Sequence, residues 1–255
     1  DTLTAANQSA AGANINTSIS SIKTAASNEP GVAAFLLSAG GPGQTTEGTG
    51  DIGNYFPLAQ GSTWSFQGTD TTTGQYRNTT TISGTKSVGG VVTTVFSDTN
   101  FLNEGAEESY YTKDGRGLTY YGNNDSTDVV TAQLVPFLAI RFPFRTGSTF
   151  EEINKNGLGL GKDYDQDKIN DKGDLVSIVT VKGFESVTVP AGTFPNCAKV
   201  ERQTTVTVTA SSNGTRLSEQ GTETIWLASG IGQVKYVSQI ADQTVTEELT
   251  SFTPN

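Results

Sequence analysis

Three motifs occur twice in this chain, in the same order, and this repetition constrains the fold more than any other feature of the sequence. The first motif reads F-P-apolar-x-x-G-S-T-aromatic. The three pairs are residues 56–64 and 142–150, 81–88 and 180–187, and 108–121 and 223–236. A general likeness between strand-turn-strand segments explains one such match more easily than three. The order therefore predicts a tandem duplication and a chain of two related halves.

Both halves carry the pattern of antiparallel β-strands. Apolar and polar residues alternate over Tyr76–Ser83 and Val200–Thr209, which predicts a sheet with one buried and one wet face. Gly89-Gly90, Asp114-Gly115 and Asn213-Gly214 are turn signals between such runs. The sequence thus predicts an all-β fold, built either as one continuous antiparallel sheet or as two packed lobes.

The repeat also sets the expected organisation of the chain. A first β-rich half spans 52–135 and a second spans 136–255, and residues 1–51 form an N-terminal arm outside the repeat. In the arm, the spacing of three isoleucines predicts a short helix over 10–26. An apolar stretch then predicts a strand that could add to the sheet of a neighbouring molecule or cap its own sheet. Its residues are Gly31, Val32, Ala33, Ala34, Phe35, Leu36, Leu37 and Ser38.

The composition excludes several classes of function. The 255 residues include no His, no Met and one Cys, and the net charge is -10. Without His there is no Ser-His-Asp triad, no Cys-His pair and no imidazole metal ligand. The acidic balance argues against nucleic acid as a partner, and no apolar run approaches the roughly 18 residues of a transmembrane helix. Because Met is absent, we expect a removed signal peptide and a secreted, extracellular or cell-surface protein.

An Asp-rich loop over residues 163–174 is the sharpest local signal of chemistry. Acidic residues stand at its positions 1, 3, 5, 9 and 12, and a backbone carbonyl would serve at position 7, as in calcium loops. The predicted ligands are Asp163, Asp165, Asp167, Ile169, Asp171 and Asp174. Lys168 departs from the pattern, because such loops place Gly there for a sharp turn. The alternative to calcium binding is a solvated acidic loop.

Other candidate groups give weaker signals. Cys197 lies in an apolar strand with no His to activate it, so a buried structural role is expected. The acidic pair Glu151 and Glu152 is expected on a solvated face, although two carboxylates are all that a glycosidase requires. Pairs of tyrosines at 110–111 and 120–121 could stack on sugars, but one member of each pair is expected in the core.

Three segments carry a family resemblance. Residues 56–64, 187–200 and 226–236 resemble motifs of uncharacterised secreted bacterial proteins and lipoproteins, which share a domain of unknown function. The resemblance covers about residues 52–252. It implies a curved antiparallel sheet, often a half-open barrel, and a bacterial envelope or extracellular setting. It assigns no catalytic residue.

Together these observations predict a non-enzymatic structural protein. We expect a subunit of an extracellular fibre or surface assembly, a homo-polymer in which the N-terminal arm donates a strand to a neighbour and calcium braces the sheet. The main alternative is a secreted or periplasmic binding module that holds an apolar ligand in its curved sheet. A hydrolase that uses paired carboxylates is the third possibility.

Overall fold

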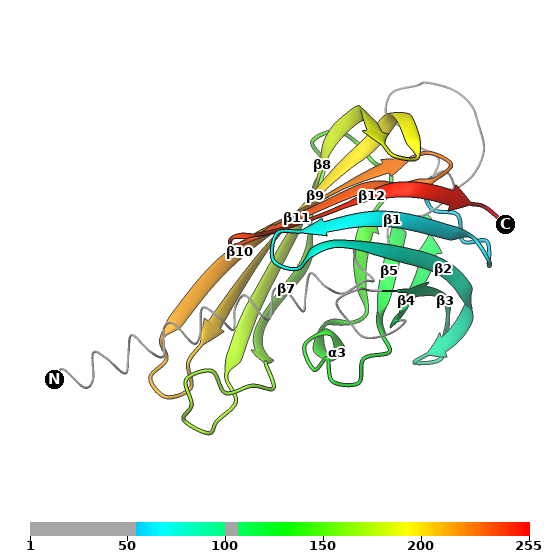
Figure 1. The fold of residues 1–255 in the computed structure, drawn as a ribbon. Coiled ribbons are helices and arrows are strands. Elements are labelled where there is room, and N and C mark those ends of the chain that lie inside the picture. Colours follow the sequence, from blue (N-terminus) through cyan, green and yellow to red (C-terminus); the bar gives the residue numbers. More distant parts are fainter. Residues whose placement is uncertain (1–54, 100–106) are drawn as a thin grey trace.

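The computed structural model describes residues 55–99 and 107–255, which form a single curved sheet (Figure 1). The predicted helix over 10–26 and the predicted assembly strand over 31–38 lie outside these residues. Within them the prediction of an all-β fold is confirmed, because every strand pair is antiparallel and α3 (Thr131–Leu134) is a single turn of helix. The alternative of two packed lobes is excluded by the continuity of the sheet.

Twelve strands follow one another as two meanders of six, in the spatial order β6-β5-β4-β3-β2-β1-β12-β11-β10-β9-β8-β7. The first meander comprises β1 (Thr63–Asp70), β2 (Gly74–Val88), β3 (Val91–Asp98), β4 (Glu107–Asp114), β5 (Gly117–Asn123) and β6 (Phe137–Arg141). The second comprises β7 (Thr149–Gly159), β8 (Lys172–Val189), β9 (Gly192–Thr209), β10 (Arg216–Ala228), β11 (Gly232–Ile240) and β12 (Gln243–Thr253). Because β6 pairs with β5, the sheet places residues 137–141 with the first meander.

The repeated motif makes the same backbone hydrogen bonds in both meanders. The amide of Gly61 donates to the carbonyl of Ile82 at 2.8 Å, and the amide of Gly147 donates to the carbonyl of Val181 at 2.8 Å. In each case the strand register shifts directly after the accepting residue. The motif therefore fixes the start of β1 against β2 and the start of β7 against β8 in the same way.

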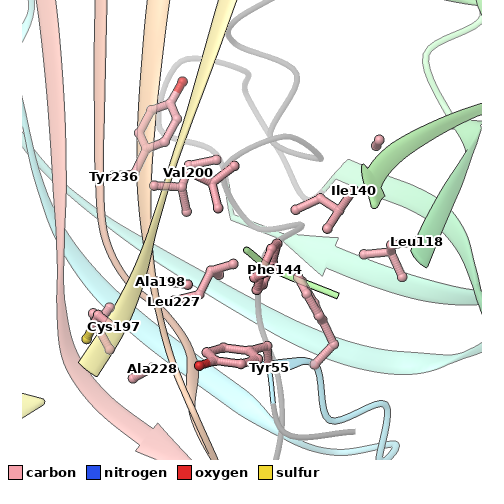
Figure 2. Close-up of a cluster of buried hydrophobic side chains, with 14 of the residues drawn as sticks. Tyr55, Leu118, Ile140, Phe144, Cys197, Ala198, Val200, Leu227, Ala228 and Tyr236 are labelled. Carbon is pink, nitrogen blue, oxygen red and sulfur yellow. The ribbon is translucent and has the colours of Figure 1, made fainter. Parts of the chain in front are cut away.

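Aromatic and aliphatic side chains fill the inside of the curved sheet. Figure 2 shows Phe144, from the loop between β6 and β7, between Ile140 and Leu118 on one side and Leu227 and Ala198 on the other, and all five belong to one buried cluster. At this level the interior is a packed core. A curved sheet of this width exposes a large apolar inner face, and side chains from its loops must cover that face.

Candidate functional site

The sheet is nearly closed, and the gap lies between its two edge strands. β1 and β12 pair along eight positions from Thr63 to Asp70, whereas β6 and β7 approach each other without forming a ladder. A pocket of about 250 Å³ opens at this junction, which we call the seam pocket. Its lining comprises Ile140, Arg141, Phe142, Pro143, Phe144, Arg145, Ser148, Thr149, Phe150, Val179, Val181 and Val200.

The seam pocket has an apolar floor and a polar rim. Phe142 and Phe144 are buried, as are the three valines from β8 and β9. Arg141 and Arg145, which flank these two phenylalanines in the sequence, are exposed at the rim. Exposed and buried residues alternate from the end of β6 into the following loop. The phenylalanine rings therefore point inward and the guanidinium groups outward.

One contact spans the gap between the two edges. The guanidinium carbon of Arg141 on β6 lies 4.8 Å from the ring centre of Phe150 on β7, a cation-π arrangement. At the closed junction the matching motif residue, Trp64, stacks on Phe252 of β12 with ring centres 5.0 Å apart. Trp64 also donates from Nε1 to the carbonyl of Ile231 at 2.8 Å. A stacked aromatic pair at one junction is therefore replaced at the other by a cation over a ring.

The two rim arginines have no acidic partner among the described residues. Their guanidinium groups form no ion pair within 4.0 Å, and the pocket lining contains no Asp or Glu. In a chain of net charge -10 this rim is a local region of positive charge. Guanidinium groups bind carboxylates and phosphates through paired hydrogen bonds, so the rim is suited to an anionic group.

A buried ionic network lies on the inner face of the second meander. Arg202 donates from Nε and Nη2 to both oxygens of Glu152, each at 2.7 Å, and from Nη1 to Oε2 of Glu223 at 2.7 Å. The hydroxyl of Tyr236 donates to Glu223 at 2.8 Å, and that of Ser177 donates to Glu152 at 2.7 Å. Burial lowers the pKa of Arg202, but the two carboxylates outweigh this effect and raise it.

This network was not evident from the sequence. Glu151 is exposed, as expected, whereas the side chain of Glu152 is only 1% exposed. The three charged residues of the network lie on β7, β9 and β10, and pairing across the sheet brings them together. Each charge is matched by hydrogen bonds, so we interpret the network as a structural element that holds β7 to β9 and β10.

A further buried carboxylate lies where the two meanders join, on β12 beside β1. Glu247 on β12 is 4% exposed and accepts hydrogen bonds from Nδ2 of Asn78 at 3.2 Å and from the hydroxyl of Tyr76 at 3.1 Å. Both bonds reach the same oxygen, Oε1, and among the described residues Oε2 has no hydrogen-bond partner. Burial raises the pKa of Glu247, and the two donors oppose this shift in part.

Three of the predicted calcium ligands converge. Carboxylate oxygens of Asp163, Asp165 and Asp171 lie within 4.8 Å of one another. Lys168, at the position where calcium loops place Gly, has a left-handed backbone with φ 74°. Burial raises the pKa of Asp165, but hydrogen bonds from Ser212 and neighbouring groups outweigh it and hold the pKa below its usual value. The left-handed turn that Gly makes in calcium loops is thus formed here by Lys168.

The other three predicted ligands are arranged differently. Asp174 turns away from the loop, accepting hydrogen bonds from Arg216 at 2.6 Å and from the amide of Gly157 at 2.8 Å. Asp167 accepts from the amide of Ile169 at 2.8 Å. The carbonyl of Ile169 accepts a long bond of 3.4 Å from the hydroxyl of Ser211, which also binds Asp167. The loop is thus held to the turn after β9 as well as folded on itself.

The remaining sequence candidates are core residues. Cys197 is buried, donates to the carbonyl of Phe194 at 3.3 Å, and has a pKa raised to about 12 by burial. Tyr120 is buried and Tyr121 is half-buried, whereas Tyr110 and Tyr111 are both buried, so the expectation of one core member fails for that pair. The aromatic pairs therefore leave little ring surface for a sugar.

Over the described residues the fold is a twelve-stranded, nearly closed antiparallel sheet with a pocket at the junction of its two edge strands. A sequence model of the DUF3108-like family matches residues 164–238, which span most of β8 to β11. This match includes two of the three segments that carry the resemblance to a family of unknown function, and it confirms that resemblance. No curated protein matches the chain.

Two crystal structures are similar in fold. One is a candidate lipoprotein from Parabacteroides distasonis ATCC 8503, with 14% identity, a TM-score of 0.41, and coverage of 78% of this chain and 98% of that one. The other is a candidate exported protein with a YmcC-like fold from Bacteroides fragilis NCTC 9343, with 14% identity, a TM-score of 0.40, and coverage of 79% and 99%. Among the residues described here, no helix combines the length and apolar character needed to cross a membrane.

Proposed function

We propose that this chain is a secreted, non-enzymatic binding module that holds an apolar group in the seam pocket. The observation that carries the proposal is the unpaired junction between β6 and β7, where the packed core of the sheet gives way to a pocket of about 250 Å³. Concave sites with an apolar lining and a few polar groups are the usual form of small-molecule sites. The volume lies just below the roughly 300–1,000 Å³ of drug-sized pockets, which favours a short acyl chain or a small aromatic compound.

The composition of the lining supports binding over catalysis. Its side chains are aromatic, aliphatic, hydroxyl and guanidinium groups, with no carboxylate, thiol or imidazole. Ser148 and Thr149 have no general base among these residues to activate their hydroxyls. The buried carboxylates Glu152 and Glu223 lie outside the pocket lining, and their oxygens are already engaged by hydrogen bonds from Arg202.

A neutral fluorescent probe tests the proposal. We expect saturable binding of N-phenyl-1-naphthylamine to the full chain, and loss of this binding in Ser148→Trp, which places a large ring at the rim. The matched control is Ser186→Trp, on β8 outside the pocket, which should bind as the unchanged protein does. Circular dichroism confirms that both variants fold. If the probe does not bind, or if Ser148→Trp binds it normally, the proposed site is wrong.

Assembly by strand addition is a second candidate function. The unpaired edges of β6 and β7 favour it, because each presents backbone donors and acceptors that an added strand can use. We propose residues 31–38 of a second copy as the added strand, which would form the predicted fibre or surface assembly. Electron microscopy of the full chain should then show polymers that deletion of residues 1–38 abolishes. Discrete monomers of the full chain contradict the idea, as do polymers of the truncated one.

We also propose that the Asp-rich loop binds calcium. The convergence of Asp163, Asp165 and Asp171 supports this, together with the left-handed turn at Lys168. Asp167 and the carbonyl of Ile169 could complete the site with water, whereas Asp174 is engaged by Arg216. Calcium takes about six to eight oxygen ligands, so several water ligands and a modest affinity are expected.

A further inference from the structure

We infer that the ligand of the seam pocket is an anionic amphiphile, with a short apolar chain and a carboxylate or phosphate head group. This inference rests on the proposed function and adds the chemistry of the head group. Its basis is the pairing of a dry aromatic floor with two exposed guanidinium groups at the rim, those of Arg141 and Arg145.

The geometry separates the two parts of such a ligand. Phe142 and Phe144 are 7% and 2% exposed, and they face the interior together with Val179, Val181 and Val200. An apolar chain that enters between β6 and β7 would reach these buried side chains at the inner end of the pocket. Its charged end would remain at the rim, where water still reaches both the head group and the arginines.

The position of Arg141 is restricted before any ligand arrives. It ends β6, pairs in register with Gly117, and has its guanidinium over the ring of Phe150 at 4.8 Å. The guanidinium therefore lies against the ring of Phe150, while the residue as a whole stays exposed to solvent. A side chain held in this way loses less conformational entropy when it binds an oxyanion.

The charge around the pocket favours an anion over a neutral or cationic group. No described carboxylate neutralises either rim arginine within 4.0 Å. The chain as a whole carries a net charge of -10, so its overall field disfavours an anion and a local group of cations is needed to attract one. Carboxylate and phosphate present the same oxygens to a guanidinium, and experiment must decide between them.

Displacement of the neutral probe by three eight-carbon compounds tests the inference. Octyl phosphate has the same octyl chain as octanol, octanoate has an alkyl chain one carbon shorter, and only octanol carries no charge. We expect the two anions to bind about 10-fold to 100-fold more tightly than octanol at pH 7.5 and low salt. In Arg141→Gln/Arg145→Gln the ratio of anion to alcohol affinity should fall toward one. The control Arg77→Gln, an exposed arginine outside the pocket, should keep the full ratio.

The outcomes separate the two proposals. Equal affinity for octanol and for both anions overturns the anionic head group but leaves an apolar binding site. A ratio that survives in the double variant also overturns it, because the preference then comes from elsewhere. If neither the probe nor any of the three compounds binds the protein, both proposals are overturned. A preference for octanoate over octyl phosphate, or the reverse, supports the inference and identifies the head group.

Discussion

Arg141 and Phe150 are joined across the seam, with the guanidinium carbon 4.8 Å from the ring centre, although their strands share no backbone ladder. We predict a coupling energy of about 0.5–1 kcal/mol between Arg141→Gln and Phe150→Leu in a double-mutant cycle. Phe150→Leu keeps an apolar side chain and removes the ring. Urea denaturation of the four proteins measures the coupling, and a value of zero would mean that the two groups are merely near each other.

Removal of Arg202 should destabilise the protein strongly. Arg202→Met leaves the carboxylates of Glu152 and Glu223 buried without a cation, which costs about 3–5 kcal/mol. The control is Lys182→Met, which removes an exposed pair with Glu201 and should cost about 1 kcal/mol or less. Chemical denaturation measures both. Similar small losses in the two variants would contradict a structural role for the buried network.

The stability contributed by Glu247 should depend on pH. Its pKa in the folded protein is raised from the ordinary value of 4.5, so the folded state binds more protons than the unfolded state as the pH rises above that value. This contribution is fully present below pH 4.5 and is lost as the pH rises through the folded-state pKa. Glu247→Gln removes the ionisation. Relative to the unchanged protein, the variant should therefore gain stability between pH 4.5 and neutrality.

Denaturation curves at several pH values measure this gain. The matched control is Glu248→Gln, whose carboxylate pairs with Lys235 at 2.7 Å on the neighbouring strand and is not fully buried. It should show no such growing gain. If the free energies of unfolding of Glu247→Gln and the unchanged protein differ by the same amount at every pH, Glu247 is not the source of the pH dependence.

Gly117 is predicted to be essential for the edge strand of the seam. A Cβ atom at this position would lie 1.8 Å from the carbonyl oxygen of Ile140, and the backbone φ is 151°. Gly117→Ala must therefore displace β6. We expect it to lower the free energy of unfolding by several kcal/mol and to abolish binding of the probe. Gly115→Ala, two residues earlier, meets nothing within 4 Å and should be nearly neutral. Thermal melting and probe titration compare the two, and equal behaviour would contradict the close packing of β6 on β5.

Calcium should raise the melting temperature if the Asp-rich loop binds it. Binding to the folded state at 100 times the dissociation constant contributes about 2.7 kcal/mol, or roughly 5–10 °C for a chain of this size. Asp171→Asn should abolish the increase, because Asp171 is buried in the group of three converging carboxylates. Asp242→Asn, in the exposed turn before β12, is the control. Melting that is unaffected by both calcium and a chelator would argue for a solvated loop.

The sequence predicted strands and turns well because their signals are local. The alternation over Val200–Thr209 lies within β9, and Gly89-Gly90 connects β2 to β3 as expected. The seam pocket could not be predicted in this way, since it depends on which two strands form the edges of the sheet. The buried ionic network could not be predicted for a similar reason. Glu152 and Arg202 are brought together only by the pairing of β7, β8 and β9.

The loop over residues 163–174 is an intermediate case. The spacing of its acids predicts convergence on one point, and carboxylate oxygens of three of them lie within 4.8 Å of one another. It could not reveal that Arg216, 42 residues away, would engage Asp174. Local spacing therefore identifies which side chains can meet, and distant partners decide which of them do.

The two junctions of the sheet have a consequence for stoichiometry. The same motif begins β1 and β7, so a chain with two such starts would offer two equivalent sites if both junctions stayed open. At the first, β12 lies against β1 along its whole length, and Phe252 fills the space beside Trp64. At the second, no strand among the described residues does so. The proposed binding module would therefore take one molecule of ligand per chain, because the closed junction fills the place that a second ligand would occupy.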